Sequence, residues 1–154
     1  MVKSLKSYLD TIFLKRKFKK ILIKDLDITV WKNNKNVVVA LIDLSDSNIE
    51  NIGEYAQQIK MDIGKEMGYK PLTNTLRMQI IFIGDNLNKS KDIKNYVDKI
   101  NNQKVVLQSI HIVDKTNKLS KSVKTWGQFF TGKYQDMIEV VIDLYLENLK
   151  DKLI

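Results

Sequence analysis

The sequence predicts an α/β protein with a mixed sheet of four to five strands flanked by helices. Two observations predict it. Apolar runs rich in Val and Ile alternate with segments whose apolar residues recur at helical spacing. The first strands follow one another closely, as in a meander, whereas the later strands are separated by helices. The expected order is helix, two or three strands, helix, strand, helix, strand, helix, in one domain of 154 residues.

The first helix and the meander are expected in the first third of the chain. Residues 3–20 favour an amphipathic helix, with apolar side chains at helical spacing. Val, Ile, Thr and Trp then favour three short strands, and the polar tetrapeptide 33–36 favours a turn between two of them. The expected strands are 21–23, 27–32 and 36–44. The last contains VVVALI, which does not alternate apolar with polar residues, so we expect it to be central and covered on both faces.

A second helix is expected over residues 47–67. Ser47 and Glu50 have the spacing of a capping box, and Gly68 can end the helix in a left-handed conformation. Residues 76–83 then predict a strand, because LRMQIIFI is apolar and bounded by turn residues.

The last third predicts a shorter helix, a strand, a loop and a long helix. The expected ranges are 90–101 for the short helix and 105–113 for the strand. A basic loop follows, and Thr125 and Gln128 have the spacing of a second capping box that would open the long helix. That helix is apolar over more than one stripe, so we expect it to pack on the sheet and on another element.

Composition excludes several classes of site. The chain has no Cys, so it has no disulfide and no thiolate metal site, and carboxylates are left as the metal option beside a single His. The scattered glycines form no phosphate-binding loop, and no cofactor is expected. No apolar run approaches the roughly 20 residues of a membrane span, and no signal peptide is evident. We therefore expect a soluble, cytoplasmic protein.

The net charge of +8 is concentrated near the N-terminus. Residues 1–24 hold eight basic residues and one acid, whereas the remaining residues are nearly balanced. This segment is a candidate surface for lipid headgroups or nucleic-acid phosphate, and the alternative is a solvated helix face. The candidates are Lys15, Arg16, Lys17, Lys19 and Lys20.

A second basic segment follows the strand over residues 105–113. It can bind phosphates, with Trp126 stacking on a base, or it can be a solvated loop beside a core tryptophan. Its candidates are Lys115, Lys118, Lys121 and Lys124.

Ser109 and His111 are expected on one face of a strand, where positions 105, 107, 109, 111 and 113 share an orientation. A Ser–His pair on one strand lacks the strained turn that presents a nucleophile, so we interpret the histidine as a packed side chain.

The order of elements resembles the restriction-endonuclease-like fold. The resemblance implies a Mg²⁺ site made by an Asp and by an acidic residue two positions before a lysine. Asp27 (or Asp25) and Asp43 would be the metal ligands, but the tripeptide Asp43-Leu44-Ser45 has no lysine at its third position. The alternative is that Asp43 ends a strand and helps to cap the next helix.

A further resemblance is carried by DITVW, VVVALIDLS, LRMQIIFIG and WGQFF, in that order along most of the chain. The sequence resembles the soluble N-terminal domain that precedes the membrane part of some Gram-positive rhomboid proteases. The resemblance implies a degenerate nuclease-like fold with a regulatory or recruiting role on the cytosolic side of a membrane protein. No rhomboid catalytic residue carries over, because the chain has no Gly-x-Ser and no membrane helix.

The sequence therefore favours a non-catalytic cytosolic accessory or regulatory domain. Its expected partners are an anionic membrane surface or the membrane-embedded remainder of the same protein. One alternative is a nucleic-acid-binding protein, such as a mobile-element product. Another is a Mg²⁺-dependent nuclease using Asp27 and Asp43.

Overall fold

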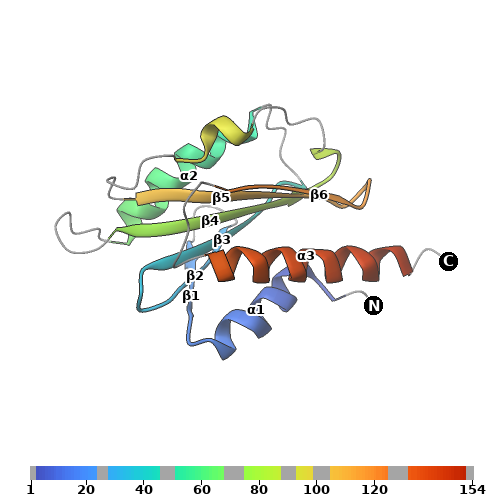
Figure 1. Cartoon of the computed structure of the whole chain (residues 1–154), viewed down its shortest axis with the longest axis horizontal. Coiled ribbons are helices and arrows are strands. Elements are labelled where there is room, and N and C mark those ends of the chain that lie inside the picture. The colour runs from blue at the N-terminus through green and yellow to red at the C-terminus, as the bar shows by residue number, and fades with distance from the viewer. Residues whose placement is uncertain are drawn as a thin grey trace.

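Six strands form one mixed sheet, with helices on both faces (Figure 1). The computed structural model describes residues 3–23, 28–45, 51–67, 75–87, 93–98, 105–124 and 132–151. The strands lie in the order of the sequence, from β1 at one edge to β6 at the other. The elements are α1 (Leu5–Lys15), β1 (Lys19–Ile23), β2 (Ile28–Lys32), β3 (Val37–Asp43), α2 (Ile52–Glu66), β4 (Leu76–Gly84), the 3₁₀ helix η2 (Ile93–Tyr96), β5 (Val105–Asp114), β6 (Leu119–Lys124) and α3 (Gly132–Asp151).

The direction of each strand follows from the length of its connection. β1, β2 and β3 are antiparallel neighbours, whereas β4 and β5 run parallel to β3. β6 returns antiparallel to β5 through a tight turn. Short turns can join only antiparallel neighbours, and a parallel pair needs a longer crossover, which α2 and η2 provide here. The expected mixed sheet is confirmed, and β3 lies inside it with residues 37–42 all buried, as VVVALI predicts.

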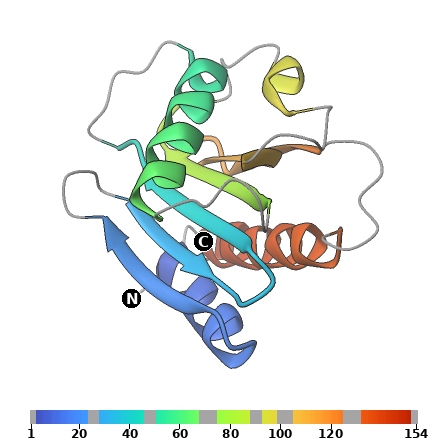
Figure 2. The ribbon, with the colours of Figure 1, turned by 90° about the vertical axis from the view of Figure 1, so that its left-hand side faces the viewer.

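The sheet separates two apolar cores. On one face, side chains from β2 to β5 pack against α2 and η2. On the other face, alternate side chains of the same strands pack against α1 and α3. Figure 2 shows α2 on one side of the twisted sheet and the pair α1 and α3 on the other. α3 contacts α1 as well as the sheet, which confirms the expectation drawn from its broad apolar surface.

The expected number of strands is too low by at least one, because the basic segment after β5 is not only a loop. Residues 115–118 form a turn, in which Lys118 has a φ of 53°, and residues 119–124 form β6. The segment LSKSVK alternates between the two faces of the sheet, and lysines are tolerated on an edge strand because they project into solvent. Because the segment is rich in lysine, its sequence predicts a loop and not this strand.

The expected first helix is too long. α1 ends at Lys15, and Lys17 has a φ of 65°, a left-handed conformation that turns the chain back toward the sheet. Lys19 and Lys20 therefore lie on β1 and not on the helix. The sequence predicts a longer helix because the buried Phe18 follows the short turn at a position that continues the apolar pattern of α1.

The second helix and the short helix are also shorter than expected. α2 begins at Ile52, and its N-cap is Asn51, whose side chain accepts a hydrogen bond from the Glu54 amide. The expected capping box at 47–50 lies outside the described residues. η2 occupies four residues of the range 90–101. α3 begins at Gly132, and the expected second capping box at 125–128 lies outside the described residues.

One irregularity changes which side chains share a face of β5. Met78 pairs with Leu107, but the next residue of β4, Gln79, pairs with Ser109, so Gln108 is an extra residue. Such a bulge reverses the alternation of side chains beyond it. Leu107 faces α2, whereas Ser109 and His111 lie toward α3. The expectation that positions 105 to 113 keep one face is therefore wrong.

Candidate functional site

A chain of buried polar side chains lies between the sheet and α3. The His111 ring is within 2.7 Å of Ser122 Oγ through Nδ1 and within 2.9 Å of Ser109 Oγ through Nε2. The Ser109 hydroxyl donates to Gln79 Oε1 at 2.6 Å, and Gln135 of α3 donates to the same oxygen at 3.2 Å. Gln79 in turn donates to Gln108 Oε1 at 2.9 Å. The bulge places Ser109 and His111 on this face and so makes the chain of contacts continuous.

The directions of these hydrogen bonds indicate which ring nitrogen of a neutral His111 carries the proton. Because the Ser109 hydroxyl donates to Gln79, its oxygen is free to accept from the Nε2–H of the ring. Nδ1 then accepts from the Ser122 hydroxyl. Burial, with a smaller contribution from the charge of Lys124, lowers the pKa of His111 to about 3. The imidazole is therefore neutral at physiological pH.

This geometry is that of a core network and not of a nucleophile with its base. Ser109 and His111 are both 0% exposed, so no substrate reaches the hydroxyl. A general base would accept the serine proton, whereas here the serine proton points to Gln79. The interpretation of His111 as a packed side chain agrees with this burial. The sequence predicts that Ser109 and His111 share a face but not the contacts with Gln79, Ser122 and Gln135, because these three come from three other elements.

Asp43 stands at the carboxyl end of β3 and is exposed. Its Oδ1 accepts from the Ser45 amide at 2.9 Å, which turns the chain at the end of the strand. The Lys115 ammonium donates to Ser45 Oγ at 2.8 Å, so a cation from the turn between β5 and β6 lies beside the position where the nuclease tripeptide would carry its lysine. Burial, and then Asp43 and Asp85, raises the pKa of Tyr145. Asp27 and Asp25 lie outside the described residues.

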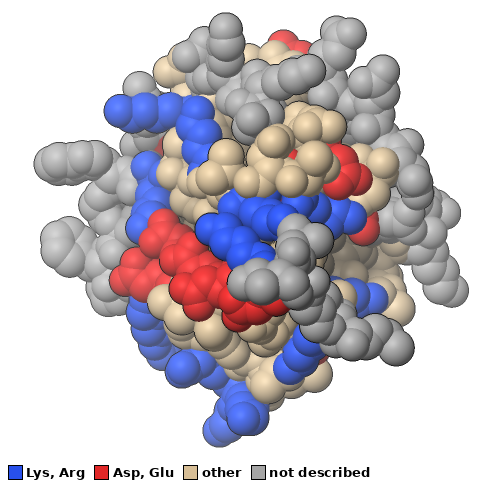
Figure 3. All heavy atoms as spheres, turned by 90° about the vertical axis from the view of Figure 1, so that its right-hand side faces the viewer, with Lys and Arg blue, Asp and Glu red and all other residues tan. Residues whose placement is uncertain are grey.

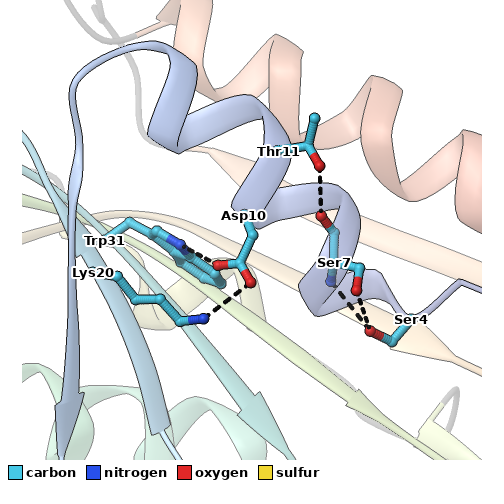
Figure 4. A network of polar contacts seen from close by, with 6 residues as sticks. All are labelled: Ser4, Ser7, Asp10, Thr11, Lys20 and Trp31. Carbon is cyan, nitrogen blue, oxygen red and sulfur yellow. Dashed lines mark hydrogen bonds and ion pairs between the residues drawn. The ribbon is translucent and has the colours of Figure 1, made fainter.

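The first basic segment forms an exposed corner between α1 and β1. Asp10 of α1 accepts from Lys20 Nζ and from Trp31 Nε1, each at 3.0 Å, and so holds the helix against β1 and β2 (Figure 4). Lys20 is thus partly neutralised. The other four cations are exposed and form no ion pair with any residue in the described ranges. We call these four the basic corner: Lys15, Arg16, Lys17 and Lys19.

The second basic segment does not form one surface. Register places Lys124 opposite Ser109 on the α3 face, where it pairs with Glu139 at 2.8 Å and Asp136 at 3.6 Å. Lys121 lies opposite Ile112 in the register of β5 and β6, and its side chain is therefore on the α2 face of the sheet. Lys115 reaches Ser45, and Lys118 lies in the turn. The structure therefore distributes the four lysines over both faces and one end of the sheet.

The outer surface of α3 is acidic and lies outside both basic segments. α3 carries five acidic and two basic residues in a protein of net charge +8. Val140 and Leu144 are 58% and 46% exposed, one helical turn apart. Helical spacing places three exposed acids around them. We call this surface the acidic face: Val140, Asp143, Leu144, Glu147 and Asp151. An acidic stripe at spacing 3 and 4 was the signal in the sequence.

Comparison with known proteins identifies no relative: the chain matches no protein-family model, no curated protein and no solved structure. Among the helices that the structure describes, none is long and apolar enough to cross a membrane. Within the same described ranges, no three His, Cys, Asp or Glu side chains are grouped so as to hold a metal ion. Function must therefore be argued from the surfaces of the chain.

Proposed function

We propose that this chain is a non-catalytic accessory or regulatory module of the cytoplasm that docks on an anionic membrane surface through the basic corner. The observation that carries the proposal is the set of four exposed cations without ion-pair partners among the described residues. A basic residue near a surface rich in anionic lipid contributes about 1 kcal/mol, so four contribute about 4 kcal/mol. That is a weak, reversible and salt-sensitive attraction.

Apolar side chains beside the cations favour a lipid surface. Leu14 of α1 is 50% exposed and Leu22 of β1 is 65% exposed. Such leucines can enter the boundary between headgroups and acyl chains while lysines contact phosphate. Asp10 keeps α1 and the two strands in a fixed relation, so docking requires little further ordering of the corner.

A weak attraction between the basic corner and anionic lipid is sufficient for docking when the module is already held near the membrane. Tethering to a membrane-embedded remainder raises its effective concentration, so a contribution of a few kcal/mol is enough to orient it. The resemblance to the cytosolic domain of rhomboid proteases agrees with this arrangement and with the proposed regulatory or recruiting role. The restriction-endonuclease-like fold belongs to the same proposal, supported by the meander β1–β3 followed by α2 and the parallel strand β4.

The test is co-sedimentation with liposomes of phosphatidylcholine alone and of phosphatidylcholine with phosphatidylserine, at low and high salt. We expect binding to the anionic vesicles only, weakened by salt. The variant Lys15→Glu/Lys17→Glu/Lys19→Glu should lose at least tenfold in binding. Its matched control is Lys65→Glu/Lys94→Glu/Lys121→Glu, which makes the same change in net charge at exposed sites elsewhere and should bind almost as the wild type does.

Two results would reject the proposal. The first is equal loss of binding in both triple variants, because the attraction would then depend on net charge and not on the corner. The second is binding to duplex DNA without binding to anionic vesicles, which would favour the nucleic-acid alternative. Cleavage of that DNA on addition of Mg²⁺, lost in Asp43→Ala, would favour the nuclease.

A further inference from the structure

The acidic face of α3 is an exposed surface with a mixed character. Leu144 has Asp143 beside it and Glu147 and Val140 within one helical turn. Asp136 and Glu139, nearer the start of the helix, are engaged by Lys124, but none of the described residues forms an ion pair with Asp143 or Glu147. Figure 3 shows acidic side chains gathered into one patch on the side of the molecule that is at the right in Figure 1. Unpaired carboxylates around exposed apolar groups suit a cationic, partly apolar partner surface.

The same molecule carries a surface of that chemistry. The basic corner presents four cations, and Leu14 beside them is 50% exposed. Each surface therefore combines apolar side chains with an excess of one charge, negative on α3, where Lys150 is the exposed cation next to Asp151, and positive at the corner. Within one copy the two surfaces cannot meet, because the α1–β1 turn and the C-terminal half of α3 lie toward opposite ends of the molecule (Figure 1).

We propose that the acidic face of one copy binds the basic corner of a second copy. The contact joins two different surfaces, so it is head-to-tail and leaves a free acidic face and a free basic corner at the two ends. Association then continues beyond a dimer as concentration rises. Exposed charge pairs contribute little individually, so the contact is weak and sensitive to salt.

Self-association on this plan limits binding at the basic corner. A corner that is covered by a second copy is not available to an anionic membrane, and a corner on a membrane leaves the acidic face of the same copy free. The self-association itself does not depend on the proposed function, since it is measured without lipid.

The test is sedimentation velocity of the full chain over a range of concentrations, at about 20 mM and about 500 mM NaCl. We expect the weight-average mass to rise with concentration at low salt and to stay near that of the monomer at high salt. Two variants each remove one half of the contact: Asp143→Lys/Glu147→Lys and Lys15→Glu/Lys17→Glu. Each alone should lower the association constant at least tenfold. Mixing the two should restore association, because each variant keeps the half that the other lacks.

Matched controls change the same charges on the α2 side of the molecule. Glu54→Lys/Glu66→Lys and Lys65→Glu/Lys94→Glu alter exposed residues and should associate as the wild type does. Far-UV circular dichroism and the urea midpoint verify that each variant is folded. A wild type that stays monomeric at low salt overturns the proposal. So does association that is lost on reversal of the acidic face but kept on reversal of the corner, because this pattern indicates contact of α3 with α3.

Discussion

The two faces of the sheet are built differently. The α2 face is apolar through its centre, with Ala40, Ile80 and Ile110 on neighbouring strands, and its buried ion pair, Lys60 to Asp98 at 3.1 Å, lies toward η2. The α3 face holds the polar network of His111 in its interior. Burial of apolar area stabilises the first face almost independently of pH, whereas the second depends on each hydrogen bond and on one neutral ring.

The largest expected effect tests the apolar face. Phe82 is fully buried there and its ring packs on Tyr55, with centroids 5.9 Å apart. Phe82→Ala removes apolar contacts and leaves a cavity, and should lower the free energy of unfolding by about 3–5 kcal/mol. Urea denaturation measures this loss, which should be the same at pH 7 and pH 5. A loss that doubles at the lower pH would show that the two faces do not differ as described.

The next effect tests the polar face through pH. The pKa of His111 is lowered to about 3 in the folded protein, against an ordinary value of 6.5. Above pH 6.5 the ring is neutral in both states and pH has no effect through it. As pH falls from 6.5 toward 3, only the unfolded chain gains the proton, so stability falls. Each pH unit in this window costs about 1.4 kcal/mol, and urea unfolding at pH 7 and pH 5 should differ by about 2 kcal/mol.

The control for this pH dependence is His111→Gln. The chain has a single histidine, so this variant removes the only imidazole that titrates in the window. It should be less stable than the wild type at pH 7, because the hydrogen bonds are remade imperfectly. Its stability should nevertheless change much less between pH 7 and pH 5 than that of the wild type does. An unchanged pH slope in the variant would place the titrating group elsewhere.

The smallest expected effect concerns Lys124, whose ion pairs lie at the partly exposed edge of the α3 face. Lys124 pairs with Glu139 and Asp136, and the hydrogen bond to Glu139 is the main reason that the pKa of Lys124 is raised. Its side chain is 36% exposed, so solvent screens the pair and Lys124→Ala should cost only about 0.5 kcal/mol. Removal of this positive charge should also raise the folded-state pKa of His111 slightly, which changes the loss of stability only near the acidic end of its window and leaves the loss between pH 7 and pH 5 almost unchanged. Urea titrations of the variant at pH 7 and pH 5 measure the small loss of stability and check that the difference between the two pH values stays that of the wild type.

The features that the sequence predicts are those encoded by local pattern. The unbroken apolar run in β3 predicts a central strand because both of its faces must be covered, and this is confirmed. The tetrapeptide 33–36 predicts a turn, and Asn33 makes it by accepting from the amides of Lys35 and Val37. The helical pattern around Ile59 and Ile63 predicts α2, although not its first residue.

The features that the sequence does not predict depend on contacts between distant segments. The polar network joins Gln79, Ser122 and Gln135 to His111, and no spacing along the chain relates them. β6 is recognised as a strand only by its pairing with β5. The basic corner differs from a helical stripe because Lys17 takes a left-handed conformation and sends Lys19 onto a strand. The composition of the sequence identifies the basic segment, whereas the fold determines which of its cations form no ion pair with the described residues.

The extra residue at Gln108 makes β5 sensitive to its length as well as to its composition. Deletion of this one residue would carry Ile110 and Ile112 to the side of α3 and would turn Ser109 and His111 into the apolar core beneath α2. A chain shorter by one residue before this point would therefore need the opposite order of polar and apolar residues after it. When sequences related to this one are aligned, a gap at position 108 should coincide with exchange of the polar and apolar positions from 109 to 112.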